Sequence, residues 1–143
     1  MGVHGGEWRV HASAVDDIEV IVDALTWLGG DDSEVSTQKE KSTLGAPMNI
    51  IIAKMTAKQT IISLGKLRRR SIEEILDSGV DSLIDDDKNL HLRLSLEALS
   101  RGGAEMSRTK GEMVAKGKFK LEVYPGQSAN QVAVGILEGL IGR

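Results

Sequence analysis

The fold is decided by the stretch Leu90-His91-Leu92-Arg93-Leu94-Ser95-Leu96 and by a second alternating run, Met113-Val114-Ala115-Lys116-Gly117-Lys118-Phe119-Lys120-Leu121-Glu122-Val123. Successive side chains of a β-strand point to opposite faces, so the leucines of the first run share one face, and His91 and Arg93 share the other. In the second run the three lysines share one face, opposite apolar residues such as Phe119. If the two strands pair, one side of their sheet is an apolar core and the other side is cationic.

The length and composition of the chain indicate one soluble domain. Its 143 residues suffice for a single compact core, so we predict one domain over residues 1–143 with a mobile, glycine-rich start at residues 1–6. No apolar run approaches the ~20 residues that cross a bilayer, and the start does not resemble a secretory signal. We therefore expect a cytoplasmic protein without membrane contact. The absence of cysteine excludes disulfides and thiolate chemistry.

The charge is unevenly distributed along the chain. The net charge is −3, but residues 1–50 hold three Lys or Arg against nine Asp or Glu, or −6, and the remainder holds fifteen against twelve, or +3. A protein with this net charge has no general attraction for polyanions, so a local cluster of cations must supply any such attraction.

Hydrophobic spacing predicts an α+β fold. Alternating residues predict strands at 8–14, 35–41, 48–55, 90–96 and 113–123, and helical spacing predicts helices at 16–28, 56–67, 71–84 and 128–140. Asp16, Thr56, Ser71 and Ser128 begin the patterns of helix capping boxes. The order is β-α-ββ-α(α)-ββ-α, which favours a largely antiparallel five-stranded sheet with helices packed on one face.

The row of lysines is the best candidate for a binding site. It would form one basic face with cations of two other predicted strands, and loop residues would extend that face. The candidate residues are Lys116, Lys118, Lys120, Arg93, His91 and Arg9, with Arg101, Arg108 and Lys110 in the loop. The alternative is that the lysines only solubilise the open side of the sheet or discourage edge pairing.

A second basic cluster, Lys66, Arg68, Arg69 and Arg70, lies at the end of the predicted helix 56–67. Cations at the end of a helix favour its dipole, by ~0.3–1 kcal/mol each, and that alone would explain the cluster. The alternative is a clamp for phosphates, which requires the helix end to lie near the basic face.

The aromatic residues indicate what kind of nucleic acid would fit. Readers of single strands stack bases on exposed rings. Trp8 and Phe119 fall in the inward phase of their strands, Trp27 is expected in the core beneath the first helix, and only Tyr124 shares the phase of the lysines. Contacts with phosphates and 2′-hydroxyls remain, which favours structured or double-stranded RNA.

Catalysis has little support in the sequence. The three histidines show no metal-ligand spacing, and Gly65-Lys66 and Gly117-Lys118 both lack the other residues of a phosphate-binding loop. The run Asp85-Asp86-Asp87 is typical of a polar turn. We therefore predict no catalytic residue, no metal and no cofactor, and not an enzyme. An enzyme acting on a phosphorylated ligand is the weakest alternative, because no nucleophile or general base can be named.

Three stretches resemble a small archaeal family described as RNA-binding and as a predicted exosome-associated component. They are Val10-His11-Ala12 with Asp16-Asp17-Ile18-Glu19-Val20, Asn89-Leu90-His91-Leu92-Arg93-Leu94, and Val123-Tyr124-Pro125. The resemblance runs from about Trp8 to Leu140 and implies a fold like that of the fifth large-subunit ribosomal protein, with exosome or ribosome-associated proteins as partners. The family continues after its arginine with charged and aromatic residues that are missing from Ser95 to Gly102, so only Arg93 and the glycine region carry over.

Our leading hypothesis is therefore a non-catalytic protein that binds structured or double-stranded RNA on a basic sheet face and is linked to RNA processing. The second hypothesis is a structural module that self-associates as a homodimer through its sheet or an edge strand, with lysines that serve only solubility. The two differ in whether RNA is retained and whether a stable dimer forms.

Overall fold

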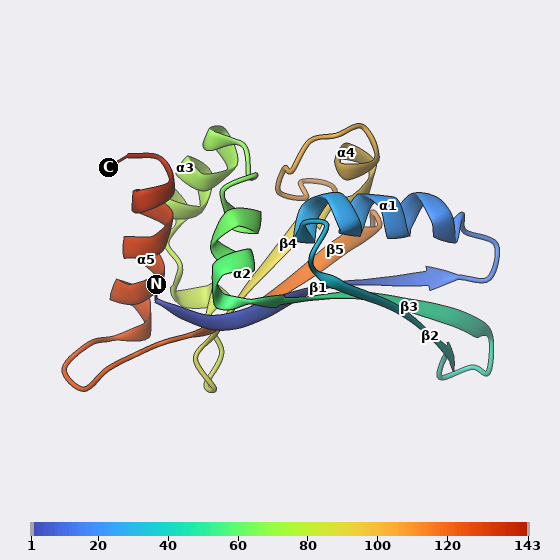
Figure 1. The fold of residues 1–143 in the computed structure, drawn as a ribbon, viewed down its shortest axis with the longest axis horizontal. Coiled ribbons are helices and arrows are strands. Elements are labelled where there is room, and N and C mark those ends of the chain that lie inside the picture. Colours follow the sequence, from blue (N-terminus) through green and yellow to red (C-terminus); the bar gives the residue numbers. More distant parts are fainter. Residues whose placement is uncertain (1, 143) are drawn as a thin grey trace.

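The computed structural model describes residues 2–142 and contains a five-stranded antiparallel sheet with helices on one of its faces (Figure 1). The strands are β1 (Val3–Ser13), β2 (Glu34–Lys41), β3 (Pro47–Thr56), β4 (Asn89–Ser95) and β5 (Val114–Leu121). The helices are α1 (Ile18–Gly29), α2 (Ala57–Leu64), α3 (Arg69–Ser78), α4 (Leu96–Ser100) and α5 (Ala129–Leu140), with a single 3₁₀ turn at Asp81–Leu83. The predicted α+β class and order of elements are confirmed.

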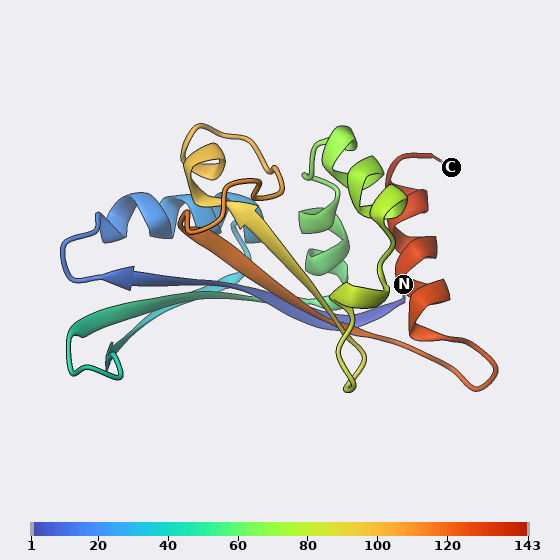
Figure 2. The same ribbon diagram turned by 180° about the vertical axis from the view of Figure 1, so that it is seen from behind.

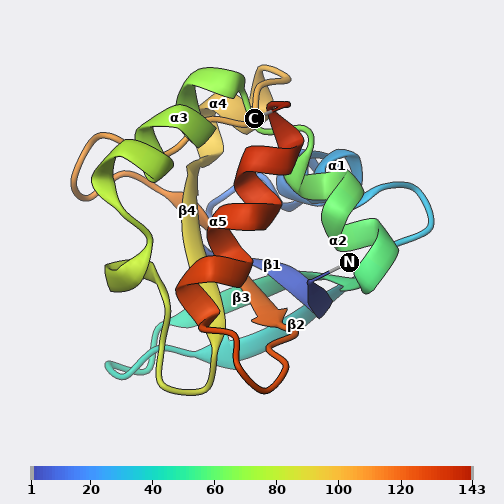
Figure 3. The ribbon, with the colours of Figure 1, turned by 90° about the vertical axis from the view of Figure 1, so that its left-hand side faces the viewer.

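The strand order is β2-β3-β1-β5-β4, so the first strand of the chain lies in the centre of the sheet. The predicted hairpin of β2 and β3 is present, and β4 pairs with β5. Views from behind and from the end of the molecule show the helices gathered on one side and the other face of the sheet uncovered (Figures 2 and 3). The sheet therefore has one apolar face against the helices and one open face.

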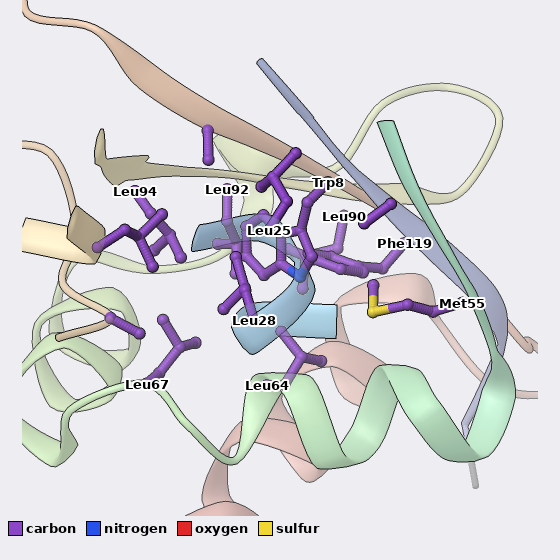
Figure 4. Packing of buried hydrophobic residues seen from close by; sticks show 14 of the residues in the cluster. Trp8, Leu25, Leu28, Met55, Leu64, Leu67, Leu90, Leu92, Leu94 and Phe119 are labelled. Atoms are coloured by element: carbon purple, nitrogen blue, oxygen red, sulfur yellow. The ribbon is translucent and has the colours of Figure 1, made fainter. Parts of the chain in front are cut away.

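Two aromatic side chains lie at the centre of the core. Trp8 and Phe119 are fully buried, as their inward phase predicted, and their rings meet edge to face with centroids 5.0 Å apart (Figure 4). The indole Nε1 of Trp8 donates a hydrogen bond of 2.8 Å to Oγ of Ser63 on α2. Gly117 faces the same rings, and a Cβ at this position would stand 2.6 Å from each of them. The glycine between Lys116 and Lys118 therefore makes room for the aromatic pair.

The beginning of the chain differs from the prediction. Residues 1–6 were expected to be mobile, but β1 begins at Val3, which is buried and paired with Leu121. The backbone N–H of Glu122 also donates to the carbonyl of Gly2. Met1 lies outside the described residues. Both positions in this part of the strand are glycine because of close neighbours. A Cβ at Gly6 would stand 2.5 Å from the ring of Phe119, and a Cβ at Gly5 would stand 3.0 Å from the backbone carbonyl oxygen of Met55.

Several predicted boundaries were also wrong. The helix predicted at 56–67 ends at Leu64, and the helix predicted at 71–84 spans Arg69–Ser78 and ends before Gly79, which has a φ of 87°. Leu96 was assigned to a strand because it continues the leucine alternation, but it begins α4, whose N-terminus is capped by Ser95. The capping boxes at Thr56 and Ser128 are confirmed.

Two predicted capping boxes and one predicted core residue do not hold. Asp17, not Asp16, caps α1. Ser71 lies within α3, where its buried hydroxyl accepts a hydrogen bond of 3.1 Å from the backbone N–H of Met106. Trp27 was expected in the core, but it is 41% exposed on α1, with the ammonium of Lys66 5.2 Å from its ring centroid. The partners of Ser71 and Trp27, which are Met106 and Lys66, lie far away in the sequence, so the hydrophobic periodicity does not reveal them.

Candidate nucleic-acid interface

Six basic side chains lie on the open face of the three adjacent strands β1, β5 and β4. Directly opposed residues of antiparallel strands share a face, and the register sets Arg9 opposite Lys116 and Lys116 opposite Arg93. One step along, Lys118 is opposite Glu7 on one side and His91 on the other, and Lys120 follows. We call this surface the basic plate, and it consists of Arg9, His91, Arg93, Lys116, Lys118 and Lys120. As the alternation of side chains predicted, these residues lie together on one uncovered face of the sheet.

Three members of the basic plate have local partners. Arg9 forms an ion pair of 3.1 Å with Glu7, and Nε2 of His91 lies 2.6 Å from a carboxylate oxygen of Asp85. The ammonium of Lys120 donates to the backbone carbonyl of Asp87 and forms no ion pair among the described residues. The charge of the plate is therefore partly neutralised at Arg9, and Asp85 holds the imidazole of His91.

The side chains of the other three members, Arg93, Lys116 and Lys118, form no hydrogen bond or ion pair within residues 2–142. They lie side by side on the two neighbouring strands β4 and β5, and both lysines are exposed. Like charges that face each other across two strands are destabilising. The row Arg9, Lys116 and Arg93 is such an arrangement, and an anion laid over it would relieve the repulsion.

Asp85 holds the turn that leads into β4. Its carboxylate contacts His91 and accepts hydrogen bonds from the backbone N–H groups of Asp87, at 2.9 Å, and Asn89, at 3.0 Å. These contacts, with His91 first, hold the pKa of Asp85 far below its usual range. The predicted polar turn at residues 85–87 is present, and it positions His91. The described residues include no group of three or more metal-ligating side chains.

His11 continues the open face of β1 beyond Arg9 but adds no charge to the plate near neutral pH. Burial lowers the pKa of His11, and the positive charges of Lys116 and Arg9 lower it further. Its neighbour across the strand pair is Ile50.

The basic plate ends at β1. On the same open face, β3 presents Ile50 and Ile52, which are only 4% and 3% exposed although no helix covers them. The facing positions of β2 are Glu34, Ser36, Gln38 and Glu40. Lys54 is the one exposed cation that β3 places on this face, opposite Glu7, and the other described cations of the open face lie on β1, β5 and β4.

The cluster Arg68, Arg69 and Arg70 does not join the plate. It lies at the beginning of α3 and not at the end of a helix, so the explanation from the helix dipole is wrong. Each guanidinium has an acidic partner: the pairs are Arg68 with Glu105 at 2.8 Å, Arg69 with Glu73 at 3.6 Å and Arg70 with Glu74 at 3.4 Å. Arg69 also donates to the carbonyl of Ile141. The cluster is on the helical side of the sheet and ties α3 to its surroundings (Figure 1).

The loop cations divide into two groups. Arg101 pairs with Glu97 on α4, away from the plate. Arg108 and Lys110 line a groove of about 600 Å³ that also contains Arg93, His91 and Asp85, so they do extend the basic plate. Arg108 is shared with Glu74, at 2.6 Å. The sequence identified the cations of this loop but gave no sign of the groove, because its walls come from three separate segments.

No described helix is long and apolar enough to span a membrane.

Tyr124 is 59% exposed but lies after the end of β5. Within residues 2–142, the open sheet face of β1, β5 and β4 thus carries cations and no aromatic ring.

The chain is similar to known proteins in both sequence and structure. A family model described as RNA binding matches residues 7–119. No curated protein matches the sequence. A DUF54 protein from Methanothermobacter thermautotrophicus superposes with a TM-score of 0.72 at 19% identity, with 98% of each chain covered. A second DUF54 protein, from Sulfolobus solfataricus, gives 0.71 at 16% identity, with 96% of this chain and 97% of that chain covered.

A UPF0201 protein from Methanococcus jannaschii is more distant, with a TM-score of 0.63 at 10% identity over 97% of this chain and 93% of its own. At these identities the similarity shows that this chain shares its fold with these proteins.

Proposed function

We propose that this chain, which belongs to the family described as RNA binding, holds structured or double-stranded RNA against the basic plate on the open face of its sheet. The observation that carries the proposal is the row of Arg93, Lys116 and Lys118, three neighbouring cations that no described acidic side chain neutralises. Cations on adjacent strands contact phosphates without reading sequence. The proposed role of this protein is then to bind RNA through the sugar-phosphate backbone and the shape of the RNA, and not to cleave it.

The buried aromatic rings favour a duplex or folded RNA over an unstructured single strand. Binding of single strands relies on exposed rings, each worth roughly 1–3 kcal/mol per stacked base. Trp8 and Phe119 are closed into the core, and Trp27 is on the helical side. Phosphates and 2′-hydroxyls are therefore the groups that the plate can contact.

The distribution of charge also orients the RNA. Helix α1 packs on the covered face of the sheet, and this helix with the segment before it contains Asp16, Asp17, Glu19 and Asp23. These acidic residues repel a polyanion from α1, whereas the plate attracts it. Because exposed charges are screened beyond about 8 Å at physiological salt, the local plate decides binding even though the net charge is negative.

The test is the affinity for a blunt RNA duplex of about 16 base pairs, measured by fluorescence anisotropy. The double variant Lys116→Glu and Lys118→Glu is compared with the matched control Lys41→Glu and Lys58→Glu, which changes the charge equally at exposed lysines outside the plate. We expect the plate variant to lose at least tenfold in affinity and the control less than threefold. Equal losses in both variants, or no loss in the plate variant, would refute the proposal.

Self-association is the second candidate. An edge strand could support it, but β2 carries Lys39, Glu40 and Lys41, and charged edges oppose pairing between molecules. A homodimer stays a prediction that light scattering at micromolar concentration tests. The resemblance also predicts association with exosome or ribosome-associated proteins and a part in RNA processing, and the composition predicts a cytoplasmic location. These likewise stay predictions.

A further inference from the structure

We propose that the groove along the outer edge of β4 holds an unpaired nucleotide of the bound RNA, so that the protein prefers a duplex with an overhang or bulge to a blunt one. This inference rests on the proposed function, because the groove begins where the basic plate ends. Arg93 and His91 belong to both surfaces. The groove has a volume of about 600 Å³, within the usual range for sites that enclose a small organic group.

The edge of β4 is covered at both ends and open between them. Ile84 bridges to Leu90 at one end, and Met106 bridges to Leu94 at the other. At the second end the N–H of Ser107 donates to the carbonyl of Arg93 at 2.9 Å. Three residues lie between the two bridges, which are roughly 13 Å apart at about 3.3 Å per residue.

Backbone groups point into the uncovered stretch. Alternate residues of an edge strand direct their N–H and C=O groups away from the sheet. The carbonyls of Asn89 and Arg93 are bonded on this outer side, to Asp85 and Ser107, so the N–H and C=O of His91 and the N–H of Arg93 point the same way. The bridge at Leu90 directs the N–H of His91 toward the carbonyl of Leu83, whereas the C=O of His91 and the N–H of Arg93 have no hydrogen-bond partner among the described residues. The groove thus contains one free backbone acceptor and one free backbone donor.

An unpaired base matches this arrangement. Every base has a donor and an acceptor on its pairing edge, so any base can donate to the C=O of His91 or accept from the N–H of Arg93. Leu83, Ile84, Met106 and Val114 supply apolar walls for the faces of the base. Arg108 and Lys110 line the same groove and can contact the phosphate that accompanies the base. Because the backbone groups accept any base, the site selects an unpaired nucleotide and not its identity.

A peptide strand fits the groove less well. Strand addition draws its affinity from a row of main-chain hydrogen bonds. The two bridges at Leu90 and Leu94 leave only two backbone groups available, and the neighbouring cations favour an anionic ligand. These observations favour RNA over a protein segment.

The experiment compares a blunt RNA duplex with the same duplex carrying a two-nucleotide 3′ overhang, again by anisotropy. We expect the overhang to raise the affinity of the native protein about tenfold, which corresponds to 1.4 kcal/mol. Two variants fill the groove from the segments that close its two ends, Ser82→Trp and Thr109→Trp. Each should abolish the gain from the overhang and leave binding of the blunt duplex unchanged. Thr43→Trp, in the exposed turn between β2 and β3, is the matched control and should keep the gain.

The outcomes separate this inference from the proposed function. If the native protein binds both duplexes equally, or if the gain survives in whichever filled variants fold as judged by circular dichroism, the nucleotide site is refuted while the plate stands. If charge reversal on the plate does not weaken binding of the blunt duplex, the proposed function itself fails. Because Ser82 and Thr109 lie in different segments, misfolding of one variant leaves the other to decide.

Discussion

Gly117 couples the core to the basic plate, and its replacement by alanine gives the sharpest test of the packing. A Cβ at Gly117 would lie 2.6 Å from Trp8 and 2.6 Å from Phe119, so the rings must move by at least about 0.8 Å to reach an ordinary contact of 3.4 Å. Forcing extra volume into a packed core costs about 1–3 kcal/mol. Movement of Trp8 also strains its hydrogen bond to Ser63, which contributes about 1 kcal/mol.

We therefore expect Gly117→Ala to lower the free energy of unfolding by about 2–4 kcal/mol. With a urea dependence of about 1–3 kcal/mol per molar, the midpoint of unfolding should fall by roughly 1–2 M. Gly135→Ala is the matched control, because Gly135 is exposed within α5 and a Cβ there has nothing within 4 Å. The control should gain about 0.5–1 kcal/mol from the higher helix propensity of alanine. Equal stability of Gly117→Ala and the native protein would refute the reasoning.

Three further predictions concern charge. Because Arg9 and His91 are paired, four plate cations remain for phosphates, so log K for a blunt duplex should fall with log salt at a slope of about −3 to −4; a slope near zero would exclude phosphate contacts. Asp85→Asn should destabilise the protein, because a carboxylate with a lowered pKa stabilises the fold only while it is ionised. The loss of stability should be full above about pH 4 and should shrink as the pH falls toward the depressed pKa of Asp85. Urea titrations at several pH values measure this, and a loss that does not depend on pH would contradict it. Bound RNA should raise the pKa of His11, since it offsets the charge of Lys116, and an unchanged imidazole titration by NMR would place the RNA elsewhere.

The basic plate could be predicted from the sequence because a period of two residues fixes the face of each side chain. Lys116 and Lys118 share a face of β5 whichever strand pairs with it. Arg93 lies on the same face because β4 pairs with β5. Trp8 and Phe119 were assigned to the core by the same rule. Alternation failed at Leu96, where the leucine pattern continues into α4 and the change from strand to helix leaves no break in hydrophobicity.

The electrostatic state of each cation could not be predicted in the same way. The acidic partners of Arg68 and Arg108 are Glu105 and Glu74, which lie more than thirty residues away in the chain. Arg68 marks the start of α3 and not the end of α2, because the chain turns between Leu64 and Arg69. The groove escaped prediction for a related reason, since it exists only where the edge of β4 meets two segments that leave it uncovered between their bridges.

The place of β1 in the sheet has a consequence for how the molecule matures during translation. This strand is synthesised first, yet its two neighbours, β3 and β5, begin at Pro47 and Val114. Chains emerge from the ribosome from the N-terminus, and contacts between distant segments form slowly. Trp8 must therefore wait, without its ring partner Phe119, until most of the polypeptide has been made. The nascent protein therefore exposes the indole of Trp8 until β5 has been made, which makes its first strand a natural binding site for a chaperone.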